Sequence, residues 1–158
     1  MTTYSRINTI VDAVITDLQT ATTLGLGASP KVYERDEHPQ AALNRGDLPC
    51  AYVIPIMEGG DEVSPGINTS SYRHEFPITV TAYYMGNDLT ATQLGTDLRT
   101  TRNYAYQYVD YYLTKSGGRT VGGGHIKKFK VDVGYWVSGG GQVVHYWIVK
   151  MDVTACSS

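Results

Sequence analysis

Apolar residues in the first part of the chain recur at spacings of three and four, as they do on one face of an α-helix. The apolar face consists of Ile7, Ile10, Val11, Val14, Leu18 and Ala21. The opposite side carries Arg6, Asp12, Asp17 and Gln19. Gly25 and Gly27 then end the pattern, and Pro30 prevents its continuation. The pattern predicts an amphipathic helix in this first segment.

The following residues are typical of short strands separated by polar loops. A strand is predicted at Lys31–Arg35 and a buried strand at Cys50–Met57, where the internal Pro55 indicates an edge or a bulge. The intervening segment Asp36–Pro49 is predicted as a loop, and so is the Gly, Ser and Asn-rich segment Glu58–Ser71.

The most regular alternation lies between Tyr72 and Tyr84. One face would carry Tyr72, His74, Phe76, Ile78, Val80, Ala82 and Tyr84. The other would carry Arg73, Glu75, Thr79 and Thr81. Because side chains alternate between the two faces of a strand, this period of two predicts a long strand with one apolar face.

A second helix is predicted from about Thr90 to Lys115. Asp88 or Thr90 can cap its N-terminus, and Gly117 and Gly118 stop it. Its expected buried stripe is Leu94, Leu98, Ala105, Val109 and Tyr112. Tyr104 and Tyr111 are expected on its flank.

Two alternating strands close the chain. In the first, Phe129, Val131, Val133, Tyr135 and Val137 alternate with Lys128, Lys130, Asp132 and Trp136. In the second, Val143, His145, Trp147, Val149, Met151 and Val153 alternate with Val144, Tyr146, Ile148, Lys150 and Asp152. The link at residues 138–141 is rich in glycine, so the two strands are expected to form a hairpin.

The predicted order is helix, strand, strand, strand, helix, strand, strand. Strands that follow one another through hairpin-like loops favour a mainly antiparallel sheet, and two amphipathic helices can cover one face of it. We therefore predict an α+β fold that forms a single domain over residues 1–158 and closes with a C-terminal hairpin.

Composition narrows the class of protein. Thirteen Lys and Arg against fifteen Asp and Glu give a net charge of −2, which excludes a protein that coats nucleic acid. Thirteen tyrosines and 17 glycines are typical of an assembly subunit, because tyrosine suits surfaces that become interfaces. No run of about 18 apolar residues predicts a membrane span, and the N-terminus lacks a signal-peptide core, so we expect synthesis in a cytoplasm.

Residues that usually carry chemistry form no recognisable site. His38, His74, His125 and His145 have no metal-ligand spacing to one another or to Cys50 and Cys156. His74 and His145 fall on apolar strand faces, as buried structural histidines do. The glycine-rich stretches at 25–27, 122–124 and 139–141 lack the Lys-Ser/Thr and following helix of a phosphate-binding loop. We expect no enzymatic activity, catalytic residue, metal or cofactor.

Two groups of charge suggest a contact between subunits. Lys115, Arg119, Lys127, Lys128 and Lys130 fall in a stretch that contains no acid. Glu58, Asp61 and Glu62 form an acidic cluster in the other long loop. These groups are either solvated surface or opposite patches of one subunit that meet head to tail, an arrangement that closes a ring when the rotation closes.

The element order and the loops resemble the tail-terminator (tail-completion) proteins of long-tailed bacteriophages. The residues that carry the resemblance are the helix around 7–14, Leu48–Pro55 entering a strand, Tyr72–Val80, the helix Leu94–Leu113 and the closing hairpin. The pattern extends over nearly the whole chain.

The resemblance implies a non-enzymatic virion protein, assembled in the host cytoplasm, that sits as a homohexameric ring on the head-proximal end of the tail tube. Such a ring stops polymerisation of the tube protein and provides the surface for head–tail joining. The implied partners are the major tail tube protein, a head-side connector and, in a contractile tail, the sheath protein. Genomic DNA in the lumen would make only transient, non-specific contact.

The expected mechanism is capping by loops. The segments 36–49 and 58–71, together with Gly139, Gly140 and Gly141, would order on the terminal tube ring and cover its polymerising surface. Two alternatives stay open. One is another neck component, a head–tail adaptor or stopper. The other is an α+β domain that binds a small molecule in a tyrosine-lined pocket near Trp136 or Trp147.

Overall fold

A computed structural model describes residues 3–35, 47–57, 60–65, 72–86, 90–115, 118–137 and 141–157. Within these residues the chain forms two helices and seven strands. The helices are α1 (Thr3–Thr20) and α2 (Ala91–Thr114). The strands are β1 (Lys31–Glu34), β2 (Cys50–Pro55), β3 (Glu62–Pro65), β4 (Tyr72–Met85), β5 (Thr120–Val121), β6 (Gly124–Val137) and β7 (Val143–Ser157).

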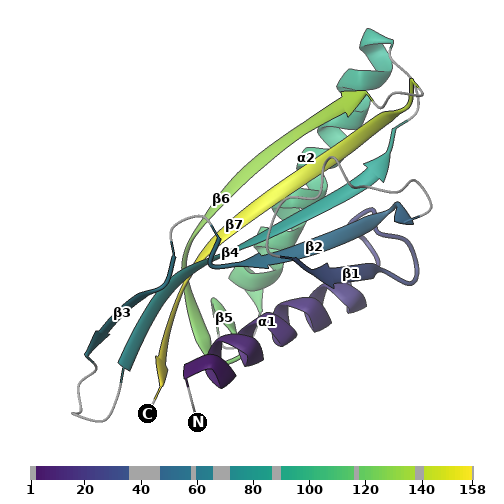
Figure 1. Cartoon of the computed structure of the whole chain (residues 1–158). Coiled ribbons are helices and arrows are strands. Elements are labelled where there is room, and N and C mark those ends of the chain that lie inside the picture. Colours follow the sequence, from purple (N-terminus) through teal and green to yellow (C-terminus); the bar gives the residue numbers. More distant parts are fainter. Residues whose placement is uncertain are drawn as a thin grey trace.

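The strands form one sheet in the order β1-β2-β4-β7-β6-β5, and β3 also pairs with β4 (Figure 1). Every pairing is antiparallel except that of β1 with β2, which run in parallel. The predicted α+β class, mainly antiparallel sheet and closing β6–β7 hairpin are therefore confirmed. The parallel pairing at β1 was not foreseen.

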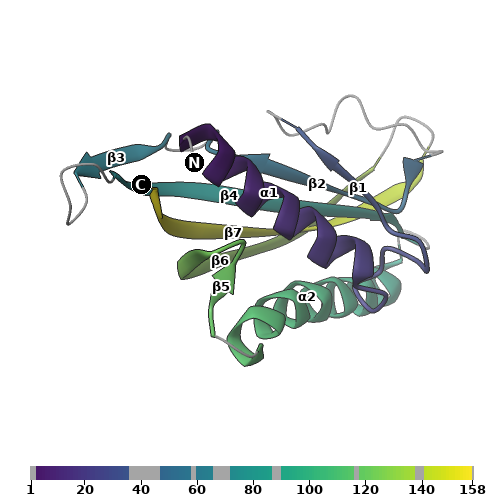
Figure 2. The ribbon, with the colours of Figure 1, turned by 90° about the horizontal axis from the view of Figure 1, so that it is seen from below.

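Both helices pack on one face of the sheet (Figure 2). The largest side chains of this core, all less than 2% exposed, include Trp147 of β7, Ile10 and Leu18 of α1, and Tyr108 and Tyr112 of α2. The sheet supplies the apolar positions of the predicted β4 and β7 faces, among them Phe76, Ile78, Val80, Val149, Met151 and Val153. The period-two pattern thus identified the correct face.

Helix α2 begins with the cap that the sequence suggested, because the hydroxyl oxygen of Thr90 accepts the backbone N–H of Gln93. Its predicted buried stripe is correct only in the C-terminal half. Leu94 and Leu98 are partly exposed, and the buried positions of the first turns are polar, Asp97 and Thr101. These two face polar partners on the sheet.

Several strand limits differ from the sequence prediction. The predicted loop 58–71 contains β3, and β2 ends at Pro55 because Ile56 takes a φ of 71° and its amide donates to Pro77 O at 2.8 Å. Strands β6 and β7 are longer than predicted, and β5 was missed. A strand that is exposed on both faces, as β3 is, leaves no alternation to detect.

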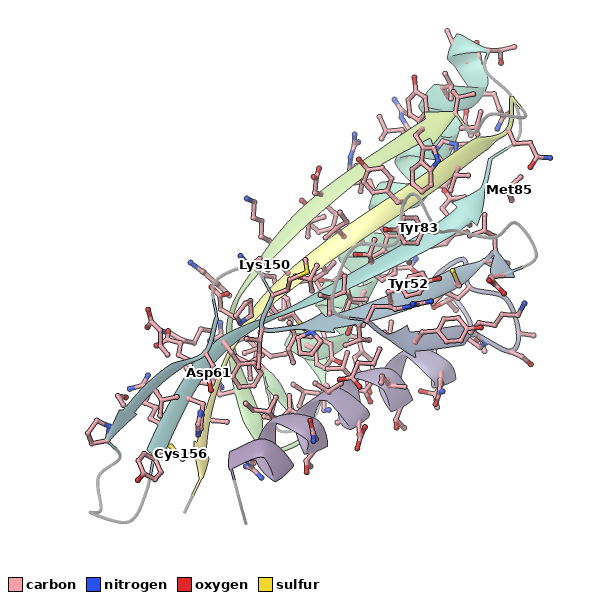
Figure 3. The ribbon with its side chains drawn as sticks, in the orientation of Figure 1. Tyr52, Asp61, Tyr83, Met85, Lys150 and Cys156 are labelled. Carbon is pink, nitrogen blue, oxygen red and sulfur yellow. The ribbon has the colours of Figure 1, made fainter. Side chains whose placement is uncertain are left out.

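A second, smaller apolar cluster lies on the sheet face opposite the helices. It contains Cys50, Tyr52, Ile54, Tyr83 and Val144, with Leu48, Met85, Trp136 and Tyr146 against it. Figure 3 shows Tyr52, Tyr83 and Met85 on the neighbouring strands β2 and β4. Burial here raises the pKa of the Cys50 thiol to about 11, so Cys50 is an inert packing residue.

Candidate functional site

One end of the sheet extends beyond the helices. Strand β3, residues 72–75 of β4 and residues 154–157 of β7 form this extension, which we call the arm (Figures 1 and 2). All four residues of β3 are exposed, and the apolar side chains of Val63 and Tyr72 are 54% and 51% exposed. The arm therefore carries paired strands without a covering layer at its outer end.

The base of the arm is fixed by a buried contact. The Nδ1 atom of His74 on β4 lies 2.9 Å from Oδ2 of Asp61, the residue that precedes β3. The His74 side chain is completely buried, on the sheet face that carries Phe76. The position of Asp61 is labelled in Figure 3. This contact holds the start of β3 against β4, so the direction of the arm is fixed from within the subunit.

Strand β6 does not follow β7 into the arm. The last β6–β7 pair is His125 with Thr154, and residues 155–157 of β7 pair only with β4. The edge of β7 is thus unpaired within the described chain, and a hollow of about 560 Å³ lies beside it. We call this hollow the notch. It is lined by Arg6, Pro65, Arg73, Gly123, His125, Thr154, Ala155 and Cys156.

The notch is basic. Arg6, Arg73 and His125 line it, and no carboxylate does. The Nη2 atom of Arg6 donates to Gly123 O at 2.9 Å, while its buried Nε finds no acceptor in the part of the chain that the structure describes. A buried N–H without an acceptor is unfavourable.

The opposite edge of the arm is acidic. Glu62 of β3 lies directly across from Glu75 of β4, and like charges in this position destabilise a sheet. Lys127 donates to Glu75 at 2.5 Å, and this hydrogen bond and charge hold the pKa of Glu75 below its usual range. Glu62 forms no ion pair within the described residues.

The long free edge of β6 differs from both edges of the arm. The Asp132 carboxylate accepts the Val133 amide at 2.9 Å, so this outward N–H is already occupied. Lys128 and Lys130 are exposed on the same strand. Charged side chains and locally bonded amides are devices that keep edge strands from pairing. The β6 edge is therefore protected against pairing along this stretch.

A polar network joins α2 to the sheet. His145 Nε2 lies 3.2 Å from Asp97 Oδ2, and the Tyr84 ring stacks on the His145 ring at 5.5 Å. Burial lowers the pKa of His145, although the Asp97 charge acts in the opposite direction. The Tyr84 hydroxyl makes a short hydrogen bond with Thr101, whose own hydroxyl donates to Asp97 O. The network explains why Asp97 and Thr101 are buried.

A further hollow of about 330 Å³ separates the end of α1 from α2. It is lined in part by Asp17, Tyr108 and Tyr111. The hydroxyls of Tyr111 and Tyr112 donate to the Asp17 carboxylate at 3.2 and 2.9 Å, so this acid serves helix packing. In the described part of the chain, no group of three His, Cys, Asp or Glu side chains is placed to hold a metal ion.

The residues predicted to form subunit contacts are partly engaged within the subunit. Lys127 pairs with Glu75, Lys128 Nζ lies 3.3 Å from Asp152 Oδ2, and Asp61 contacts His74.

Of the other predicted contact residues, Lys115 lies over the rings of Tyr111 and Tyr112, and Arg119 and Lys130 are exposed. Glu58, Gly139 and Gly140 lie outside the described residues, as does most of the predicted loop 36–49. Gly141 takes a φ of 76° beside β7.

Sequence reasoning missed the notch. Arg6 was assigned to the polar side of the first helix, Arg73 to a strand face and His125 to no site, and only the fold brings them together. The sequence pattern gave no signal for it, because the predicted last strand ended at Val153, before the residues of β7 that extend past the start of β6.

Comparisons with known proteins give little to transfer. No family model matches the chain, and no curated protein matches it. A solved structure described as the virion of a native gene transfer agent (GTA) particle contains a chain of 14% identity, aligned over 97% of this chain and 100% of that one, with a TM-score of 0.48. At that identity and TM-score, the likeness fixes neither fold family nor role. None of the described helices is long and apolar enough to cross a membrane.

Proposed function

We propose that this protein is a structural subunit of a phage-like virion, and that it forms a homohexameric ring in the neck. The ring caps the head-proximal end of the tail tube, stops polymerisation of the tube protein and provides the surface for head–tail joining. The resemblance of the sequence to tail terminators supplies this assignment. The observation in the structure that supports it most is the arm.

The arm supports self-assembly because, within the described residues, its two edges are unpaired and its side chains Val63 and Tyr72 are exposed. A few strands without a covering layer bury little apolar surface and are marginal in water. A neighbour that pairs with them would supply the missing hydrogen bonds and cover Val63 and Tyr72. Because the two edges of the arm differ, such contacts run head to tail, and head-to-tail contacts that close produce rings.

The chemistry of the chain agrees with a structural role. Three of the acids and two of the histidines described above are engaged in packing contacts: Asp17 with two tyrosines, Asp61 with His74, and Asp97 with His145. None of these contacts aligns a nucleophile, a base and an open pocket, which is the arrangement that acyl or phosphoryl transfer requires. A ring subunit needs no such alignment.

The proposed partners are a second copy of this chain, the major tail tube protein, a head-side connector and, in a contractile tail, the sheath. Contact with DNA in the lumen would be transient, consistent with a net charge of −2. The ring would assemble in the host cytoplasm and remain in the neck of the virion.

The test combines native mass spectrometry with tube-length measurement. We expect a hexamer without bound small molecules, and a narrow distribution of tube lengths in electron micrographs when the protein is added to polymerising tube protein. Deletion of Gly139–Gly141 is expected to give overlong tubes while leaving the hexamer intact. A monomer with a stoichiometric ligand, or unchanged tube growth with the wild-type protein, would contradict the proposal. Localisation on the head side of the connector would instead identify an adaptor or stopper.

A further inference from the structure

Within the proposed ring, we infer that neighbouring subunits are joined through their arms: β3 of one copy enters the notch of the next and pairs with residues 155–157 of β7. This inference rests on the proposed function. The arms would then form one continuous belt of strands around the ring, three strands from each subunit.

The two edges match in length. The free part of β7 comprises Ala155, Cys156 and Ser157, and β3 comprises four residues, Glu62–Pro65. Both segments are extended and about 10–13 Å long at the usual rise of a strand. The volume of the notch, about 560 Å³, is in the range of ligand-binding pockets and leaves room beside β7 for a short strand.

The directions of the strands are also compatible with a closed ring. Strand β3 is antiparallel to β4, and β4 is antiparallel to β7, so β3 and β7 point the same way. Subunits in a ring are related by rotation alone, and each arm therefore has the same orientation about the axis. The junction between β7 of one copy and β3 of the next is thus a parallel pair.

Charge at the two edges is complementary. Glu62, which faces Glu75 in its own subunit, would enter a notch lined by Arg6, Arg73 and His125. An incoming strand also brings backbone carbonyls and carboxylates, which accept hydrogen bonds from guanidinium groups such as those of Arg6 and Arg73. The same junction would place basic side chains beside the Glu62–Glu75 contact.

The long free edge of β6 is less suited to this contact. It carries exposed lysines and the bonded Val133 amide, and such features oppose pairing. Within the described residues, both edges of the arm are unpaired, and Val63 and Tyr72 on the arm are exposed.

The register of the arm provides a direct test with a native cysteine. Ser64, Arg73 and Cys156 form one row across the arm and share a sheet face, whereas Val63 lies on the other face with His74 and Ala155. In the proposed junction, a Ser64→Cys side chain approaches Cys156 of the next copy. A Val63→Cys side chain, in the adjacent position, points to the opposite face. Figure 3 labels Cys156 near the end of β7.

Each variant would be mildly oxidised under the conditions in which native mass spectrometry detects the ring, and then separated on a denaturing gel. We expect Ser64→Cys to give a ladder of covalent oligomers up to the size of the ring. Glu62→Cys is included because a closed belt of strands is staggered, which can shift the contact by two residues. Val63→Cys is the matched control and should give no more covalent dimer than the wild type.

A second measurement uses the unmodified chain. Cys50 is buried and Cys156 is exposed in the single subunit. Occupation of the notch would cover Cys156, so its reaction with a thiol reagent should slow when the ring forms.

The outcomes distinguish a failure of the proposed ring from a failure of the proposed junction between arms. No ring at any concentration would overturn the proposed function and this junction together. An intact ring with no covalent dimer from Ser64→Cys or Glu62→Cys would overturn the junction alone. Equal yields from Ser64→Cys and Val63→Cys, or unchanged Cys156 reactivity in the ring, would also overturn it, since paired strands must discriminate between the two faces.

Discussion

The turn between β5 and β6 allows the packing of α1 to be tested with a matched pair of glycine variants. Gly122 has a φ of 55°, and a Cβ placed on it would lie 2.7 Å from Ile10 Cα and 3.0 Å from Thr9 O. Gly118 has a φ of 76° but nothing within 4 Å of the corresponding position. Alanine at either site is strained because the backbone is left-handed there. Only in Gly122→Ala does the added Cβ also collide with α1.

The magnitudes follow from these two terms. A non-glycine residue in the left-handed region costs about 1–2 kcal/mol, and the reduced freedom of the unfolded chain offsets about 0.4–1 kcal/mol of that. Gly118→Ala should therefore lower the free energy of unfolding by about 1.6 kcal/mol or less. Overpacking against a backbone that must retreat adds about 1–3 kcal/mol. Gly122→Ala should thus cost about 1–3 kcal/mol more than Gly118→Ala.

Urea unfolding followed by tryptophan fluorescence measures the difference, because Trp147 is completely buried in the core that α1 covers. Both variants should be compared at one low protein concentration, since association would add its own stabilisation. Equal losses for Gly122→Ala and Gly118→Ala would refute the close approach of α1 to this turn. Arg6 lies about one helical turn before Ile10, so Gly122→Ala should also disturb the notch and weaken ring formation.

Two further predictions concern charge. Burial lowers the pKa of His145, so below the usual histidine pKa of about 6.5 the unfolded chain binds a proton more readily than the folded chain, and the free energy of unfolding should fall as the pH falls toward the lower folded pKa. Urea unfolding between pH 5 and 8 should show this slope, and His145→Gln should reduce it. A slope that is unchanged in His145→Gln would contradict the reasoning. The double variant Lys127→Glu/Lys128→Glu should weaken the ring in native mass spectrometry. It should change the free energy of unfolding only slightly, because the ion pairs of both lysines are exposed. An unchanged ring would show that these lysines lie outside the interface.

The fold could be predicted where one face of an element is covered by the rest of the chain. Strands β4 and β7 alternate cleanly because the helices bury one face, and Phe76 and Trp147 point into that core. The first half of α2 misled the prediction for the opposite reason. Its buried positions are polar, because Asp97 and Thr101 meet His145 and Tyr84, and a hydrophobic pattern cannot encode such a pairing.

Tyrosine content indicated interfaces only in part. Four of the tyrosines, Tyr52, Tyr83, Tyr108 and Tyr112, are buried and pack on other aromatic rings within the subunit. Others are exposed, among them Tyr33, Tyr72, Tyr106 and Tyr135. A count of tyrosines cannot separate these uses, because the same ring packs equally well in a core and in a contact between subunits.

The arm is the part of the described chain where sequence prediction failed most, and its failure has a physical cause. Strand β3 was assigned to a loop because the segment Glu58–Ser71 is rich in Gly, Ser and Asn. A strand with both faces exposed requires no alternation that could have corrected this. A hydrophobic pattern marks those faces of helices and strands that other parts of the same chain bury. Where paired strands have no such cover within the described residues, as at Val63 and Tyr72, we propose that another molecule supplies it. Crosslinking from Ser64→Cys to Cys156 asks whether that molecule is a second copy of this chain.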